Sequence, residues 1–298
     1  MRQRRAGKFA GGTAVVTGGA SGIGRAISAE LAARGTRLVI ADIDGDAARR
    51  AASEVAAALS LDDGSVTSRN LDVRDEAAFH ALIDEVADTH NGIDLLFNNA
   101  GIAIGGPTHE LTAAHWDYAI DINIRGVVNG VLAAYPRMVE QGRGHIINTA
   151  SGAGLAAPPF VAAYAMTKHA VVGLSLALRP EAALHGVKVS VLCPGSVETA
   201  ILDRRPPPDL PVTPSEAVTA REYLAVVRQK PIAADRFARS ALQAVARNKS
   251  VIVVPRSAKT LWYLQRFSPW LTERICRQLA RKVQSDLIRP RADGSTSS

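Results

Sequence analysis

Short apolar segments rich in β-branched residues alternate along this chain with longer alanine-rich stretches, and no other feature limits its fold as strongly. Seven such segments are expected to be strands: residues 13–17, 37–41, 66–71, 93–97, 145–149, 187–193 and 251–254. The first six are each followed by a helical stretch or a glycine turn, an order typical of βαβ units. The sequence therefore predicts an α/β fold, a doubly wound parallel sheet of about seven strands with helices on both faces.

The alternation runs without a linker from residue 9 to residue 256, so this part is expected to be a single domain. Residues 196–230 break the pattern with Pro206-Pro207-Pro208, Pro211 and Pro214. A long irregular segment of this kind is typical of a lid over a substrate site. Residues 257–298 follow the last expected strand as a basic, amphipathic C-terminal tail.

The net charge of +7 is concentrated at the two ends of the chain. Four basic residues among the first eight contribute +4 and the residues from Ser257 onward contribute +5, which leaves −2 for residues 9–256. This distribution argues against a nucleic-acid groove in the predicted domain.

The cysteine content and the apolar runs bear on the compartment. Cys193 and Cys276 are too few for a disulfide framework and fit a reducing environment. No apolar run approaches the roughly 20 residues that span a bilayer, and the basic N-terminal residues are not followed by the apolar run of an export signal. We therefore expect no signal peptide and a cytoplasmic protein. The histidines show no metal-site spacing.

Three glycines follow the first expected strand and lead into a helix. Gly18, Gly22 and Gly24 follow Thr17 in the spacing T-G-x-x-x-G-x-G. A glycine turn at this place lets the backbone approach a pyrophosphate, and the helix N-terminus supplies amide donors and a positive dipole end. The alternative is a turn needed only for tight strand–helix packing.

Asp42 ends the second expected strand, 18 residues beyond Gly24. A carboxylate at this position accepts hydrogen bonds from ribose hydroxyls and repels the additional phosphate of NADP. Neither Ser21 nor Ile43 is basic, so the sequence predicts NAD rather than NADP. The alternative role for Asp42 is a helix cap.

Tyr164 and Lys168 lie four residues apart in an expected helix, which places a phenol and an ammonium on one face. A neighbouring cation favours the phenolate, so we expect the tyrosine pKa to fall from about 10 toward neutral pH. Such a tyrosine exchanges a proton with an alcohol or a ketone. The pair by itself is a weak pattern, because the spacing is common in helices.

Several further motifs occur in a definite order with these ones. They are Thr17-Gly18-Gly19-Ala20-Ser21-Gly22-Ile23-Gly24, Asp72, Asn98-Asn99-Ala100-Gly101, Asn123, Ser151, Tyr164-x-x-x-Lys168 and Pro194-Gly195-Ser196-Val197-Glu198-Thr199, with 13 residues from Ser151 to Tyr164. Over residues 9–256 the chain resembles the short-chain dehydrogenase/reductase family in its ordinary single-domain, NAD(P)-dependent form, with a Rossmann-type fold.

The resemblance implies four catalytic residues. Tyr164 is expected to be the general acid/base, and Lys168 to lower its pKa and bind the nicotinamide ribose. Ser151 is expected to hydrogen-bond the substrate oxygen, and Asn123 to support a water that links Lys168 to solvent. The family also implies a homo-oligomer, a dimer or tetramer, in which two long helices, about 112–139 and 159–185, pair between subunits.

The same resemblance implies a cofactor site. It comprises Gly18, Ser21, Gly22, Ile23, Gly24, Asp42, Asp72, Val73, Asn99, Ala100, Gly101, Tyr164, Lys168, Pro194, Gly195, Val197 and Thr199. Asn98 is expected to line the cleft as well, and Thr199 to hydrogen-bond the carboxamide of the nicotinamide. No metal is expected.

The residues beside the expected reaction centre are mostly apolar, which favours a hydrophobic secondary alcohol or ketone as substrate. They are Ile102, Ile104, Leu155, Pro158, Pro159, Phe160, Val197, Ile201 and Leu202. In the tail, Leu271, Ile275, Leu279 and Val283 recur every four residues with basic residues between them. This pattern fits either a helix on an anionic membrane surface or a helix that packs on the domain or a partner subunit and covers the substrate cleft.

Three other functions stay open at this point. One is a dinucleotide-binding regulator or scaffold without turnover, against which the complete set of catalytic residues argues. Another is a carbonyl reductase that prefers NADP. The third is an isomerase or dehydratase on the same fold, for which the chain lacks a longer substrate domain.

Overall fold

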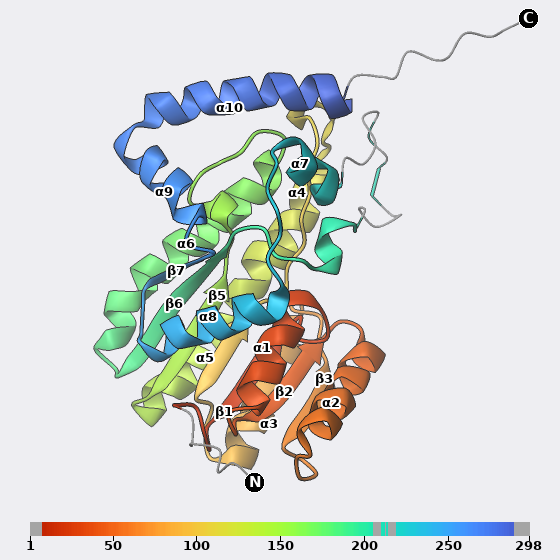
Figure 1. Ribbon diagram of the computed structural model, residues 1–298. Helices are drawn as coiled ribbons and strands as arrows, with labels where there is room; N and C mark the ends of the chain where they lie inside the picture. The colour runs from red at the N-terminus through yellow and green to blue at the C-terminus, as the bar shows by residue number, and fades with distance from the viewer. Residues whose placement is uncertain (1–7, 205–209, 212, 214–218, 289–298) are drawn as a thin grey trace, which may run out of the picture.

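The computed structural model contains a single sheet of seven parallel strands in the order β3-β2-β1-β4-β5-β6-β7 (Figure 1). The structure describes residues 8–204, 210–211, 213 and 219–288. The strands are β1 Thr13–Thr17, β2 Arg37–Asp42, β3 Val66–Asn70, β4 Leu95–Asn98, β5 Gly144–Thr149, β6 Val187–Pro194 and β7 Val251–Val254. The predicted doubly wound α/β fold is therefore confirmed.

The central strands are buried on both faces, which explains their continuous apolar runs. All five residues of β1 are buried, as are all four of β4. The chain order reverses between these two neighbours, because β2 and β3 lie on one side of β1 while β4 to β7 lie on the other. In an open parallel sheet, the crevice beyond the carboxyl ends of the strands at such a reversal is the usual ligand site.

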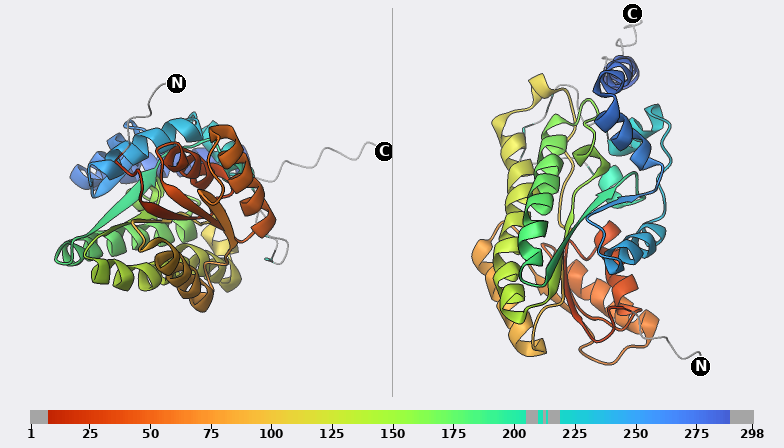
Figure 2. Two further views of the ribbon diagram at one scale, coloured as in Figure 1. Left: turned by 90° about the horizontal axis from the view of Figure 1, so that it is seen from below. Right: turned by 90° about the vertical axis from the view of Figure 1, so that its left-hand side faces the viewer.

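Helices cover both faces of the sheet (Figure 2). One face carries α1 Gly22–Ala32, α2 Gly45–Leu59 and α8 Ala234–Ala246. The other face carries α3 Glu76–His90, α5 Gly126–Gln141 and α6 Ala162–Ala183. The large side chains of Phe79, Phe97 and Phe237 are fully buried in these two layers.

The long helical region expected over about 112–139 is interrupted. It consists of α4 Ala113–Ile120, a π-helical turn Asp121–Arg125 and α5. Single π-helical turns are rare and frequently mark functional sites. Asn123 lies inside this turn.

Residues 196–230, which their prolines suggested to be an irregular lid, contain a helix that was not expected. A 3-10 turn, Ala200–Leu202, follows β6, and α7 covers Ala220–Val226. A capping box starts α7, in which Thr219 and Glu222 bind each other's backbone amides. Residues 205–209, 212 and 214–218 of the expected lid lie outside the described residues.

Two helices form the described part of the tail, α9 Ala258–Phe267 and α10 Pro269–Val283, followed by a π-helical turn, Gln284–Ile288. Ser268 lies between them, as the C-cap of α9 and the N-cap of α10. Pro269 follows as the first residue of α10, a position at which proline is favoured in helices. The ammonium of Lys282 donates to the carbonyl of Val226, 3.1 Å away, which links α10 to α7. Among the described residues, no helix combines the length and the hydropathy needed to cross a membrane.

Candidate active site

A cavity of about 1100 Å³ opens beyond the carboxyl ends of the strands. Its lining includes the β1–α1 turn, the ends of β2 to β6, the start of α6, the lid and both tail helices. The volume exceeds the usual range of roughly 300–1000 Å³ for a small-molecule pocket. The cavity therefore has room for a ligand larger than a typical single small molecule.

The glycine turn forms one wall of this cavity. Gly18 has a φ of +59°, and a Cβ on it would lie 2.9 Å from the Cα of Ala100. Ser21, the N-cap residue of α1, makes no side-chain hydrogen bond to the first turn of the helix, and that turn contains no acidic residue. The amide groups at the start of α1 are therefore left for an anion at the cavity wall.

Gly24 is the exception among the predicted cofactor residues. It lies inside α1 and does not line the cavity. A Cβ there would lie 2.1 Å from the carbonyl oxygen of Gly18 and 2.6 Å from Nδ2 of Asn99. Gly24 thus allows the helix to pack on the turn without itself lining the cavity, and its part in the cofactor site stays a prediction.

Thr17 and Asn99 join the glycine turn to the end of β4. The Thr17 hydroxyl accepts from the backbone amides of Asn99 and Ala100 at 3.0 and 3.1 Å. The Asn99 side-chain amide donates to the carbonyl oxygens of Thr17 and Gly18 at 3.1 and 3.3 Å. These bonds hold the two turns together across the reversal in strand order.

Asp42 faces the glycine turn from the end of β2. Its Oδ2 accepts from the backbone amide of Ala20 at 3.1 Å, and the residue lines the cavity. The helix cap of α2 is Asp44, whose side chain accepts from the amide of Ala47. Asp42 therefore does not cap the helix, and the alternative considered for it does not hold.

Asp72 lines the cavity next to Val73, as expected, but it is paired with a cation that sequence reasoning overlooked. The Arg74 guanidinium donates to both carboxylate oxygens: Nε lies 3.0 Å from Oδ1 and 2.9 Å from Oδ2, and Nη2 lies 2.6 Å from Oδ2. This hydrogen bonding lowers the pKa of Asp72. Arg74 itself lines the cavity. Its position two residues after Asp72 was the available signal.

Tyr164, Lys168 and Ser151 all line the cavity. Tyr164 and Lys168 project from α6, and the Lys168 ammonium lies 5.7 Å from the centre of the tyrosine ring. Lys168 is 3% exposed, and its ammonium donates to the carbonyl oxygen of Thr149 at 3.1 Å. Burial lowers the pKa of Lys168 to about 8.

The expected fall in the Tyr164 pKa is not found in the free protein. Burial raises the pKa of this phenol above its usual value, and the hydrogen bond with Ser151 opposes the rise. The charge of Lys168 therefore does not dominate, because desolvation penalises the phenolate and also lowers the pKa of the lysine itself. Four-residue spacing correctly predicted proximity but not the direction of the shift.

Asn123 is fully buried and lies behind the cavity lining. Its Oδ1 accepts from the amide of Ile102 at 2.9 Å, and its Nδ2 donates to the carbonyl of Ile102 at 3.0 Å and to the Thr167 hydroxyl at 3.1 Å. Asn123 thus ties the segment after β4 to α6. Its oxygen keeps a second lone pair, so the water-linking role stays a prediction.

Asn98 does not line the cleft, contrary to expectation. It is 2% exposed, and its Nδ2 donates to Oδ1 of Asn148 on β5 at 2.9 Å. Side chains alternate between the faces of a strand, so Asn98 points into the core where Asn99 points to the cavity. Leu155 and Pro159, expected beside the substrate, also lie outside the lining.

The remaining predicted cofactor residues all line the cavity: Ser21, Gly22, Ile23, Val73, Ala100, Gly101, Pro194, Gly195, Val197 and Thr199. So do Tyr223 and Leu224 from α7, Val227 at its C-cap, and Leu261, Trp262, Leu279 and Val283 from the tail. Leu279 and Val283 belong to the tail repeat, for which a helix covering the substrate cleft was one expectation, whereas the other residues had no expected place in the site. Their contact with the cavity depends on tertiary packing, and the only available sequence signal was their apolar character.

The sequence matches a known family over most of the described domain. The family model for short chain dehydrogenases matches residues 12–209. Levodione reductase from Leifsonia aquatica is 34% identical over 220 residues, which cover 74% of this chain and 81% of the reductase. D-beta-hydroxybutyrate dehydrogenase from Rhizobium meliloti is 36% identical over 196 residues, which cover 65% and 75% of the two chains.

Solved structures agree with the sequence comparisons. A short-chain dehydrogenase/reductase from Burkholderia phymatum in complex with NAD has a TM-score of 0.80 and 34% identity, over 89% of this chain and 96% of that one. The crystal structure of levodione reductase has a TM-score of 0.70 and 30% identity, over 83% and 96% of the two chains. The chain therefore belongs to the short-chain dehydrogenase/reductase family of oxidoreductases.

Proposed function

We propose that this protein is an NAD-dependent oxidoreductase that transfers a hydride between NAD(H) and a hydrophobic secondary alcohol or ketone. One observation carries the proposal. Tyr164, Lys168 and Ser151 share a single cavity with a glycine turn at a helix N-terminus and with a carboxylate, Asp42, at the end of the neighbouring strand.

The cavity wall fits a dinucleotide. Gly18 and Gly22 both have positive φ values, +59° and +52°, and a Cβ on Gly22 would lie 3.1 Å from Thr199. Side chains at these positions would fill the space where the pyrophosphate is expected, beside the uncapped amides of α1. When bound, the nicotinamide of NAD supplies the hydride acceptor, or in NADH the hydride donor.

Three observations support NAD over NADP. The Asp42 carboxylate lines the cavity at the place expected for the adenosine ribose, where it would repel a phosphate. The nearby guanidinium of Arg74 is already bound to both oxygens of Asp72. The Burkholderia phymatum relative was solved with NAD.

The proposed proton chemistry uses groups of this chain only. The Tyr164 hydroxyl takes the proton of an alcohol during oxidation, or gives one to a ketone during reduction. Ser151 hydrogen-bonds the same substrate oxygen and stabilises the charge that develops there. Lys168, whose pKa is lowered to about 8, places its ammonium 5.7 Å from the centre of the tyrosine ring.

The substrate end of the cavity supports an apolar substrate. Seven of the residues expected beside the reaction centre line the cavity: Ile102, Ile104, Pro158, Phe160, Val197, Ile201 and Leu202. Phe160 has a φ of +62°, rare for an aromatic residue, and its carbonyl accepts from the amide of Gly106 at 2.8 Å. Strain of this kind persists where a loop needs one particular shape. The named activities of the relatives, on levodione and on D-beta-hydroxybutyrate, fit a carbonyl or alcohol substrate.

We also propose a homo-oligomer. Leu132 on α5 and the α6 residues Met166 and Leu176 are 46%, 39% and 44% exposed. These side chains belong to the two long helices for which the family resemblance implies pairing, and such a pairing would cover them.

The experiment that tests the function is a spectrophotometric assay of the full chain at 340 nm with NAD or NADP and a panel of secondary alcohols. We expect NADH to form with apolar alcohols, with kcat/KM for NAD exceeding that for NADP. A tenfold preference for NADP would contradict the cofactor assignment. Absence of turnover over a broad panel, with intact binding of NAD, would favour a dinucleotide-binding regulator.

A further inference from the structure

The tail helix α10 has two faces of different character. Leu279 and Val283 face the cavity, and Val283 is fully buried. The apolar repeat of the tail therefore points inward in its second half and is not available to a membrane. Figures 1 and 2 show α10 at one end of the molecule, with its opposite side facing away from the sheet.

The opposite side of α10 carries an exposed row of arginines that begins with a tryptophan. Trp270, Arg274, Arg277 and Arg281 are all exposed. At 3.6 residues per turn, these four positions fall within about 60° of one another around the helix axis. This row lies on the side of α10 opposite Leu279 and Val283. Because Leu279 and Val283 pack toward the cavity, the tryptophan and the three arginines point to solvent.

Aromatic side chains gather where α9 meets α10. Phe267 is 79% exposed, Trp270 is 67% exposed and Tyr263 is 47% exposed. The rings of Tyr263 and Phe267 are stacked, with their centroids 6.4 Å apart. Large aromatic residues with this much exposure, next to each other, are unusual on a surface that contacts only water.

The charges around these aromatic residues are mostly uncompensated. Arg277 pairs with Glu273 on the same helix. Arg274 and Arg281 form no ion pair or hydrogen bond with the described part of the chain. The residues from Ser257 onward carry a net charge of +5. This surface therefore presents two guanidinium groups that have no partner among the described residues, together with apolar rings.

We infer that the outer face of α9 and α10, defined by Tyr263, Phe267, Trp270, Arg274 and Arg281, docks on an anionic lipid surface. Phe267 and Trp270 enter the boundary between headgroups and acyl chains, where Trp is enriched, and the arginines bind anionic headgroups. A second copy of the chain fits less well. Pairing this face with itself would bring arginines of like charge together, and the cores of protein interfaces are depleted of charge.

The inner side of α9 contributes Leu261 and Trp262 to the cavity lining. Docking through the outer face would therefore place lipid on one side of the tail and the cavity on the other. Under the proposed function, an apolar substrate dissolved in the bilayer then has a short path to the active site. The binding of lipid itself does not depend on that function.

Co-sedimentation of the full chain with vesicles tests the inference. We expect binding to vesicles of phosphatidylcholine mixed with phosphatidylglycerol, little binding to phosphatidylcholine alone, and release at high salt. The double variant F267S/W270S should bind the mixed vesicles at least about tenfold more weakly, since two inserted aromatic side chains are lost. Both positions are exposed, so folding, checked by thermal unfolding, should be preserved.

The matched control is Leu184→Ser, which removes an 82% exposed apolar side chain just beyond α6 and should leave vesicle binding unchanged. Full-length protein that stays in the supernatant with the mixed vesicles would overturn the inference. So would equal binding by F267S/W270S and wild type. A change of oligomeric state in that variant, without any vesicle binding by wild type, would identify the face as a contact between copies. None of these readouts depends on turnover.

Discussion

His145 is a buried histidine in the sheet that remains neutral in the folded protein. It lies on β5, is 5% exposed, and its Nε2 is 2.8 Å from the hydroxyl of Ser190. That hydroxyl donates its proton to the carbonyl of Lys249 at 2.7 Å, so we assign the hydrogen of the histidine ring to Nε2. Burial, reinforced by nearby positive charges, lowers the pKa of His145 to about 3.

Mild acid should therefore destabilise the protein through His145. Below pH 6.5 the unfolded chain takes up a proton on this residue, whereas the folded protein does not until about pH 3. Stability falls through this window as the pH is lowered, by up to about 1.4 kcal/mol per pH unit. We expect wild type to lose roughly 2 kcal/mol more than His145→Asn between about pH 7 and about pH 5, measured by urea unfolding.

His185→Asn provides the control for this measurement. His185 is exposed just beyond the end of α6, so its removal should leave the pH dependence of unfolding as in wild type. If His145→Asn and wild type lose the same stability between the two pH values, His145 is not the responsible group.

For single residues of the site, the sequence predicted where side chains lie better than it predicted their pKa values. Thr17, Asp42, Tyr164 and Lys168 belong to ordered motifs, and local geometry at a strand end or on a helix face determines where their side chains point. The direction of the Tyr164 pKa shift could not be obtained this way, because desolvation depends on how many other segments surround the phenol.

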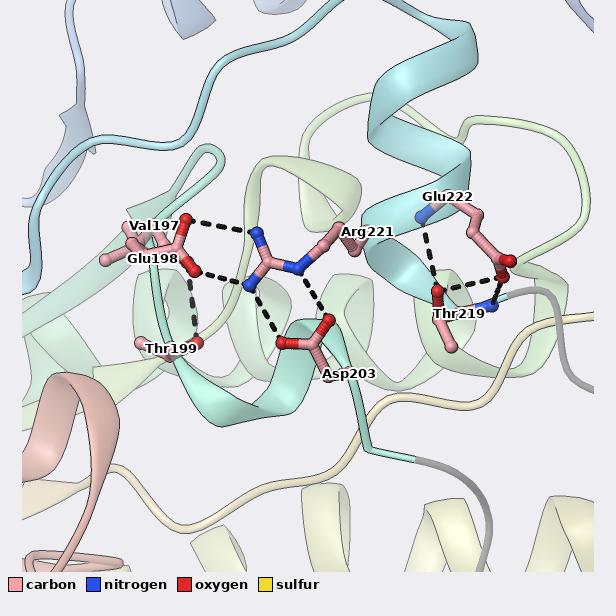
Figure 3. A network of polar contacts seen from close by, with 7 residues as sticks. All are labelled: Val197, Glu198, Thr199, Asp203, Thr219, Arg221 and Glu222. Carbon is pink, nitrogen blue, oxygen red and sulfur yellow. Dashed lines mark hydrogen bonds and ion pairs between the residues drawn. The ribbon is translucent and has the colours of Figure 1, made fainter.

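Among the elements, the lid helix α7 is linked to the loop after β6 through the ion pairs of one arginine. The Arg221 guanidinium lies between the carboxylates of Glu198 and Asp203, with Nε 2.5 Å from Oδ1 of Asp203 and Nη1 3.2 Å from Oε2 of Glu198 (Figure 3). This pairing lowers the pKa of both carboxyl groups. Val197 and Thr199, which flank Glu198, both line the cavity.

Arg221→Ala should loosen α7 without unfolding the protein. The three side chains are 43–55% exposed, and exposed ion pairs contribute at most about 1 kcal/mol to global stability. We therefore expect the free energy of unfolding to change by less than about 1 kcal/mol, while amide hydrogen exchange in α7 accelerates at least about fivefold. High salt should accelerate exchange in wild type in the same direction.

Arg239→Ala is a suitable comparison, since Arg239 pairs with Asp235 on the surface of α8, away from the lid. That variant should leave exchange in α7 unchanged. If α7 exchanges at the same rate in Arg221→Ala and wild type, the helix is held by its apolar contacts and the ion pairs are incidental.

The elements themselves were largely predictable, with physically understandable exceptions. Each strand was placed to within two residues, because buried parallel strands read as short apolar runs. Helix α7 was missed because the neighbouring prolines suggested an irregular segment, although Thr219-x-x-Glu222 is a capping box. The π-helical turn at Asn123 has no comparable local signature, since it depends on bonds to Ile102 and Thr167.

At the scale of the whole molecule, the site is assembled from nearly the full length of the chain. The described lining begins at Gly18 and ends at Ile288. The half built from strand ends could be predicted, because parallel strands bring their carboxyl ends together. The half built from α7, α9 and α10 was not fixed in this way: α7 was not expected, and the apolar repeat of the tail allowed a helix on a membrane surface as well as one that packs on the domain or a partner subunit and covers the cleft.

In the proposed oxidoreductase, Tyr164 transfers the proton. Tyr164→Phe removes only the hydroxyl and keeps the ring beside Lys168. The measurement is kcat of this variant at 340 nm on an alcohol that wild type oxidises, together with its affinity for NAD. We expect kcat to fall at least about 100-fold while NAD binding is retained. Near-normal turnover by Tyr164→Phe would contradict it.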